Sequence, residues 1–157
     1  MNTIKLKSCN ENDTLKIAET MASILPKNAT IILNGDLGSG KTKFVHGFLT
    51  HYGLENDISS PTFTIVNEYI NENINIYHFD VYRLSDSSEF LEIGGEEYFD
   101  NGICLIEWGN IIQDVLPSEY VQIDFEKDND DENIRFLNIS LHGNKYISLF
   151  ENKEDLI

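Results

Sequence analysis

The chain has 157 residues, of which 27 are acidic and 11 basic, giving a net charge of −16. This length predicts a single domain, residues 1–157, with enough chain for a core without disulfides. The acidic balance argues against a protein that grips nucleic acid by itself, because phosphate contacts require clustered Lys and Arg. The N-terminus has no apolar signal core and no apolar run reaches about 18 residues, so we expect a cytoplasmic protein outside the membrane.

The first third of the chain alternates between strand and helix patterns. A short strand is predicted at Ile4–Lys7, and a helix capped by Asn12 or Asp13 follows and runs to about Leu25. The β-branched apolar run Thr30–Leu33 is typical of a strand buried on both faces of a parallel sheet. A glycine-rich turn and a second amphipathic helix come directly after it.

The remainder is dominated by short apolar or alternating runs separated by polar turns. The predicted strands are Phe63–Ile70, Ile74–Phe79, Ile103–Ile106, Tyr120–Phe125 and Ile134–Leu141. Ser85 or Asp86 can cap a short helix, and Tyr146–Phe150 fits either a strand or a short helix. The acidic segment Glu126–Asn133 is expected to be the solvated loop of a late antiparallel hairpin. These patterns predict a three-layer α/β fold with a mixed central sheet.

Residues 35–42 read Gly-Asp-Leu-Gly-Ser-Gly-Lys-Thr and match the phosphate-binding pattern G-x-x-x-x-G-K-[ST]. Glycines allow the backbone to turn its N–H groups inward onto a phosphate, and the helix that follows points its positive dipole end at the anion. Lys41 offers a cation to the β- and γ-phosphates, and the Thr42 hydroxyl can bind Mg²⁺. The pattern therefore predicts a P-loop NTPase-like fold. The predicted nucleotide-binding residues of the loop are Gly35, Asp36, Leu37, Gly38, Ser39, Gly40, Lys41 and Thr42.

A P-loop site also needs an acid to organise Mg²⁺, usually at the end of a buried strand. Glu107 ends one apolar strand and Asp80 ends a more amphipathic one. Both would lie beside the loop if their strands were parallel to the one that precedes it. A metal-site role is favoured for Glu107, whereas Asp80 could equally cap the next turn. Trp108 is either a pocket wall or a packing residue.

Several motifs together resemble one family. They are Gly35–Phe44, Ser60–Thr64, Tyr77–Leu84, Glu97–Phe99 and Ile103–Trp108. In order and spacing they closely resemble TsaE, also called YjeE, a P-loop ATPase family of bacterial tRNA threonylcarbamoyladenosine synthesis, over about residues 9–117. The resemblance implies ATP and Mg²⁺ as cofactors and TsaD and TsaB as partners, with tRNA reached only through them.

The resemblance also implies roles for single positions. Glu107 matches the family's metal-site acid, Asp80 its second acid and Trp108 the aromatic residue beside them. Thr14, at the start of the first helix, matches a position near the nucleotide. The run Ser60–Thr62 matches a switch-like loop, although its residues alone fit an ordinary turn equally well.

The leading interpretation is a Mg²⁺-dependent ATPase, slow on its own, that acts on a partner complex. Lys41 would offset the developing charge, Asp80 would position the water, and Glu107 with Thr42 would hold the metal, which makes Lys41, Asp80 and Glu107 the predicted catalytic residues. The alternatives are a small-molecule kinase, a nucleotide-dependent regulatory switch or a non-catalytic binding subunit. The chain lacks the Arg-rich lid of such kinases, and the N-K-x-D run of GTPases is absent.

Overall fold

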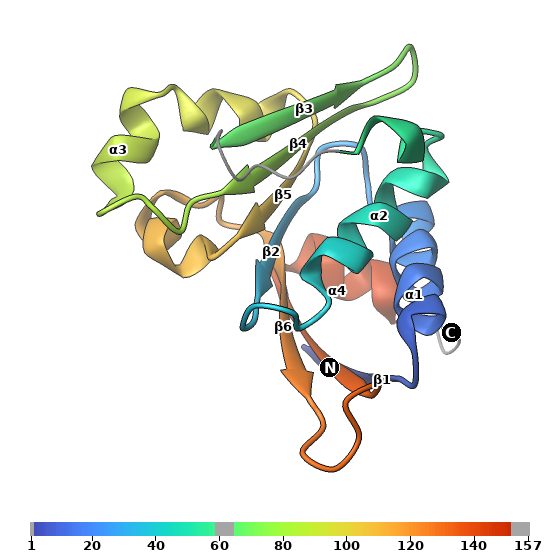
Figure 1. The fold of residues 1–157 in the computed structure, drawn as a ribbon. Helices are drawn as coiled ribbons and strands as arrows, with labels where there is room; N and C mark the ends of the chain where they lie inside the picture. The colour runs from blue at the N-terminus through green and yellow to red at the C-terminus, as the bar shows by residue number, and fades with distance from the viewer. Residues whose placement is uncertain (1, 59–64, 152–157) are drawn as a thin grey trace.

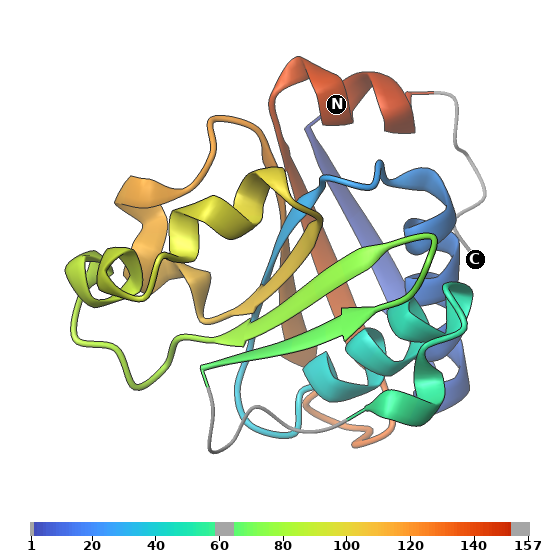
Figure 2. The ribbon, with the colours of Figure 1, turned by 90° about the horizontal axis from the view of Figure 1, so that it is seen from above.

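A computed structural model describes residues 2–58 and 65–151, and in these ranges a seven-stranded sheet lies between two groups of helices (Figures 1 and 2). The elements in chain order are β1 (Thr3–Ser8), α1 (Glu11–Ile24), β2 (Thr30–Asn34), α2 (Lys41–His51), η1 (Glu55–Asp57), β3 (Val66–Ile70), β4 (Asn75–Asp80), α3 (Ser87–Glu92), η2 (Gly95–Asp100), β5 (Ile103–Glu107), η3 (Gly109–Val115), β6 (Tyr120–Lys127), β7 (Arg135–His142) and α4 (Asn144–Phe150). Elements labelled η are 3₁₀ helices. The predicted α/β fold is confirmed.

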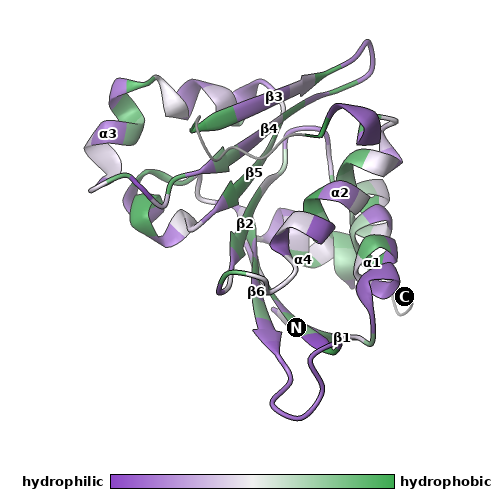
Figure 3. Ribbon diagram, viewed as in Figure 1, coloured by the Kyte–Doolittle hydropathy of each residue, from purple (hydrophilic) through white to green (hydrophobic). Residues whose placement is uncertain are grey.

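The strand order is β1-β7-β6-β2-β5-β4-β3, so the sheet is mixed, as predicted. The four inner strands β6, β2, β5 and β4 are parallel, whereas β1, β7 and β3 are antiparallel to their neighbours. The continuous apolar runs of β2 and β5 place them inside the sheet, because such strands are covered on both faces. The late hairpin is formed by β6 and β7, and Figure 3 shows its turn as hydrophilic.

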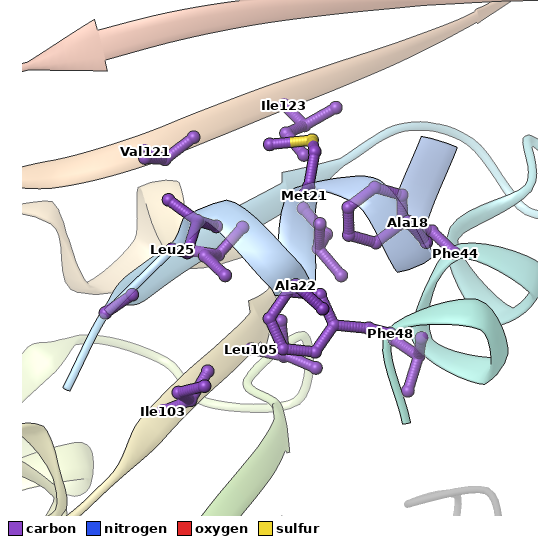
Figure 4. Close-up of a cluster of buried hydrophobic side chains, with 14 of the residues drawn as sticks. Ala18, Met21, Ala22, Leu25, Phe44, Phe48, Ile103, Leu105, Val121 and Ile123 are labelled. Carbon is purple, nitrogen blue, oxygen red and sulfur yellow. The ribbon is translucent and has the colours of Figure 1, made fainter. Parts of the chain in front are cut away.

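Side chains alternate across the sheet and build a core on each face. On one face, α1, α2 and α4 cover β2, β5 and β6, and Met21 and Leu25 of α1 point toward Ile123 and Val121 of β6 (Figure 4). On the other face, aromatic and aliphatic side chains of α3, η2 and η3 pack on β2, β4 and β5, and Phe90 contacts Phe79 of β4 there. The sheet is therefore the middle layer of three.

The start of α1 differs from the prediction. Its N-cap is Asn10, not Asn12 or Asp13, and Asn10 Oδ1 accepts a hydrogen bond from the Asp13 N–H at 2.9 Å. Asp13 instead lies in the first turn, where its carboxylate accepts from the Cys9 N–H at 2.9 Å. This reciprocal arrangement satisfies two backbone donors at once, which a cap at Asn12 or Asp13 would not.

Other boundaries shift by a few residues. β3 begins at Val66 rather than Phe63, and residues 63 and 64 lie outside the described ranges. Asn71 Oδ1 accepts from the Ile74 N–H at 3.0 Å, so Ile74 belongs to the turn and β4 begins after it. Asp86 caps α3, and the C-terminal run is helical. Within residues 2–58 and 65–151, none of the helices has the length and apolarity needed to span a membrane.

Candidate functional site

Three of the parallel strands end at the same edge of the sheet. In the register of the sheet, Leu33 of β2 and Asp80 of β4 both lie opposite Glu107 of β5. The glycine-rich loop leaves β2 directly after this point. The topology therefore brings together the loop and the two strand-end acids that the sequence singled out, as expected for the carboxyl edge of an open parallel sheet.

The loop needs glycine for two different reasons. A β-carbon at Gly35 would lie 2.5 Å from Ser39 Oγ and 3.0 Å from Phe125 Cβ, so no side chain fits there. Gly40 has φ 110°, in the left-handed region, and precedes α2 without any side-chain cap. The first N–H groups of α2 are therefore left without a capping side chain, which is the arrangement that favours an anion at a helix N-terminus.

Lys41 is buried at the centre of this edge, with only 6% of it exposed. Its Nζ donates to the Gly35 carbonyl at 2.5 Å, lies 3.9 Å from Glu107 Oε1 and sits 4.2 Å from the centroid of the Trp108 ring. Burial lowers the pKa of Lys41 below its usual value, although Glu107, Asp80 and Asp36 oppose that shift. A bound polyphosphate would favour the charged form of this amine further.

These groups border a cleft of about 830 Å³. The predicted site residues that line it are Thr14, Leu37, Gly38, Gly40, Lys41, Thr42, Asp80, Glu107 and Trp108. Gly35, Asp36 and Ser39 are not among its lining residues. The Gly35 carbonyl accepts from Lys41 Nζ, Ser39 is buried within the loop, and the Asp36 carbonyl accepts from the Ser39 N–H at 3.0 Å. Their contacts within the loop help to shape it, and their contact with a nucleotide stays a prediction.

Sequence reasoning missed the rest of the lining. The additional residues are Asn10, Glu11, Asn12, Leu15, Lys43, Glu132, Asn133 and Arg135. Asn10, Glu11, Asn12 and Leu15 belong to the start of α1. The capping pattern there marked the beginning of a helix but gave no reason to place it beside the loop. The last three come from the turn and strand of the late hairpin, and nothing in their local sequence indicated this position.

The β6–β7 hairpin also contacts the glycine-rich loop directly. Lys127 Nζ donates to the Leu37 carbonyl at 3.1 Å, and an Arg135 Nη donates to the Gly38 carbonyl at 3.2 Å. Arg135 further donates to the carbonyls of Glu132 and Ile134 within its own hairpin. One guanidinium thus connects the acidic turn to the tip of the loop, because its planar fork offers several donors at once.

Two strand-end carboxylates and one hydroxyl of α2 offer oxygen atoms to the cleft. Asp80, Glu107 and Thr42 all line the cleft, and Mg²⁺ is usually held by one or two carboxylates together with substrate phosphates. In the described part of the chain no group of three or more His, Cys, Asp and Glu side chains could hold a metal without such a ligand. Asp80 Oδ1 accepts from the Tyr82 N–H at 3.1 Å, while Glu107 Oε2 lies 2.7 Å from His78 Nε2.

Trp108 and Thr14 also line the cleft. Trp108 is the one non-glycine residue in the described ranges with positive φ, at 64°, and its N–H donates to the Leu33 carbonyl at 3.1 Å. This conformation turns the ring over Lys41 and beside Tyr82, 5.2 Å away, so it is a pocket wall as well as a packing residue. Thr14 is buried with its hydroxyl 2.7 Å from Ser8 Oγ. The run Ser60–Thr62 lies outside the described residues.

A buried parallel strand, a glycine-rich loop and a helix that opens with Lys-Thr, beside two strand-end acids, define a P-loop-type α/β protein. Comparison with known proteins narrows this class. A model of the family described as "Threonylcarbamoyl adenosine biosynthesis protein TsaE" matches residues 8–135. The chain belongs to the TsaE family, whose members take part in tRNA threonylcarbamoyladenosine biosynthesis.

Individual relatives agree with this assignment. The TsaE protein of Bacillus subtilis is 40% identical over 152 residues, covering 96% of this chain and 94% of its own. That of Haemophilus influenzae is 38% identical over 139 residues, covering 87% and 88%. The crystal structure of Bacillus subtilis YdiB matches with a TM-score of 0.78 at 35% identity, covering 95% of this chain and 92% of that one.

Proposed function

We propose that this chain binds ATP with Mg²⁺ in the cleft and hydrolyses the γ-phosphate. The observation that carries the proposal is the position of the buried Lys41 amine between the loop and Glu107, in a cleft that Asp80 also lines. A buried cation next to uncapped helix N–H groups is a binding site for a polyphosphate. The neighbouring carboxylates would repel that anion unless a divalent cation accompanied it.

Hydrolysis would proceed by attack of water on the γ-phosphorus and cleavage of its bond to the β,γ-bridging oxygen, giving ADP and inorganic phosphate. Lys41 and the loop N–H groups would offset charge on the transferring group, and Asp80 would orient the water and accept its proton. Glu107 and Thr42 would hold Mg²⁺, and the ion would supply positive charge that offsets the charge of the phosphates. Trp108 would shield the Lys41 amine from bulk solvent.

The second part of the proposal concerns the pathway. We infer that the ATPase serves the tRNA N6-threonylcarbamoyladenosine machinery through TsaB and TsaD rather than by handling tRNA itself. Membership of the TsaE family supports the pathway. A net charge of −16 supports an indirect route to tRNA, because the chain has few cations with which to neutralise a phosphate backbone.

The test is phosphate release from ATP and from GTP, each with and without Mg²⁺, measured for the chain alone and after addition of TsaB and TsaD. We expect slow, Mg²⁺-dependent release from ATP that rises when both partners are present. Phosphate transfer to a small-molecule acceptor in place of water would indicate a kinase. Nucleotide binding without turnover under any condition would indicate a regulatory subunit, and no nucleotide binding would contradict the site itself.

A further inference from the structure

His78 lies next to the proposed site but has no role in it so far. It belongs to β4, is only 4% exposed, and its Nε2 is 2.7 Å from Glu107 Oε2. Asp80 is paired with Glu107 across the two strands, and His78 precedes Asp80 by two residues. Side chains two apart on a strand point to the same face, so His78 and Glu107 meet diagonally on the face where α2 begins.

The two oxygens of the Glu107 carboxylate have different surroundings. Oε2 is engaged by His78, whereas Oε1 is directed toward Lys41 Nζ at 3.9 Å, beyond hydrogen-bond length. In the described part of the chain, His78 is therefore the one group within hydrogen-bond distance of this carboxylate. The orientation of Oε1 toward the cleft depends on what holds Oε2.

The His78 ring has no second polar partner among the described residues, because its buried Nδ1 has no hydrogen bond. A histidine kept to link two parts of a core would be expected to use both nitrogens, since a buried polar atom without a partner is costly. Among the described residues, the only polar contact of the ring is the one to Glu107. The hydrogen-bonding capacity of the ring is therefore used on the Glu107 carboxylate.

We propose that His78 is a positioning residue for the Mg²⁺·ATP reaction: its Nε2–H donates to Glu107 Oε2 and fixes the carboxylate with Oε1 facing the cleft. This inference rests on the function proposed above and adds a residue to it. Groups that hydrogen-bond to a metal-binding carboxylate typically change metal affinity or activity by about 10–100-fold when removed. His78 does not itself contact the nucleotide in this scheme.

The test compares His78→Leu, which removes the donor, with His78→Gln, whose side-chain amide can place an N–H near the same point. The probe is a fluorescent ATP analogue titrated with Mg²⁺ and with EDTA, alongside steady-state ATP hydrolysis. For His78→Leu we expect the Mg²⁺ concentration at half-maximal binding to rise about tenfold, with little change in Mg²⁺-free affinity. His78→Gln should bring the Mg²⁺ concentration at half-maximal binding most of the way back to the parent value. His142→Leu, which alters a histidine outside the cleft, should match the parent.

A double variant separates positioning from packing. If His78 acts through Glu107, His78→Leu combined with Glu107→Gln should be no worse than Glu107→Gln alone, because both changes remove the same contribution. Thermal unfolding of each variant checks that it folds. Parent-like Mg²⁺ dependence in a folded His78→Leu protein, equal loss in the Leu and Gln variants, or additive effects in the double variant would each overturn the role of His78. A parent chain that binds no nucleotide would instead overturn the proposed function, and the positioning role with it.

Discussion

At the scale of single residues, Lys41 carries the strongest chemical expectation. Its amine is buried and its pKa is lowered by that burial, so its charged form depends on nearby anions. We expect Lys41→Ala to weaken binding of a fluorescent ATP analogue by roughly 10–100-fold, the loss typical of a charge-assisted hydrogen bond. Lys16→Ala, which removes an exposed lysine of α1, is the control. Unchanged ATP binding and hydrolysis in Lys41→Ala would show that the loop has been misassigned.

Asp80 and Glu107 are neighbours in the sheet but are expected to act differently. Glu107→Gln should raise the Mg²⁺ requirement, since it replaces an ionic ligand by a neutral one. Asp80→Asn should lower turnover more than nucleotide affinity, if Asp80 orients water. Steady-state kinetics at several Mg²⁺ concentrations would distinguish the two. Equal losses of binding and turnover in both variants would contradict this division of roles.

The two cysteines differ in reactivity for a physical reason. Cys9 is exposed, whereas burial raises the pKa of the Cys104 thiol to about 12. At pH 8 only about one part in ten thousand of Cys104 would be thiolate, which is the reactive form. We expect a thiol reagent to modify one cysteine quickly in the native protein and the second only after denaturation. Rapid native-state modification of both, read by mass spectrometry, would contradict the burial of β5.

At the scale of elements, the contact between α1 and α2 depends on a glycine. A β-carbon at Gly47 would collide with the Leu15 carbonyl and lie 2.9 Å from Ala18 Cβ. A glycine-to-alanine change inside a helix normally stabilises it, so the sign of the effect is diagnostic. We expect Gly47→Ala to lower the free energy of unfolding by roughly 1–3 kcal/mol, measured by denaturant titration. His46→Ala, on the same helix, is the matched control, and a stabilised Gly47→Ala protein would contradict the close packing.

The late hairpin is expected to support the loop from outside. Because Arg135 joins the Gly38 carbonyl to the carbonyls of its own turn, Arg135→Ala should loosen the loop and weaken nucleotide binding without removing Lys41. We expect a several-fold rise in the dissociation constant of the ATP analogue, in line with the loss of one charged donor. Lys7→Ala removes an exposed cation from a strand next to the same hairpin and should bind like the parent. Parent-like binding by Arg135→Ala would mean that the contact is incidental.

At the scale of the whole molecule, charge determines which partners the chain can meet directly. The net charge is −16 and there are only two arginines, one of which is engaged by backbone carbonyls at the loop. We therefore expect negligible affinity of the isolated chain for unmodified tRNA at physiological salt. Fluorescence anisotropy with labelled tRNA would measure it, with TsaB and TsaD added in a parallel series. Tight binding by the chain alone would contradict the electrostatic argument.

Much of the fold could be predicted because its cues are local. A β-branched apolar run predicts an inner strand at Thr30–Leu33, and helix and hairpin patterns follow from periodicity and turn residues. The order of the strands could not be predicted, because neighbours such as β2 and β6 are far apart in the sequence. The ends of helices and strands also differ from the predicted ones where a side chain accepts a hydrogen bond from a backbone N–H, as Asn10 and Asn71 do.

The sequence by itself determined the loop, its lysine and the two strand-end acids, since glycine geometry and the convergence of parallel strand ends are short-range or general rules. Only the tertiary structure decided that His78 meets Glu107 and that Arg135 reaches Gly38. His78 and Glu107 are 29 positions apart in the sequence, and Gly38 and Arg135 are 97 positions apart. These contacts depend on strand order and register, which are fixed by burial of the whole sheet rather than by any local pattern.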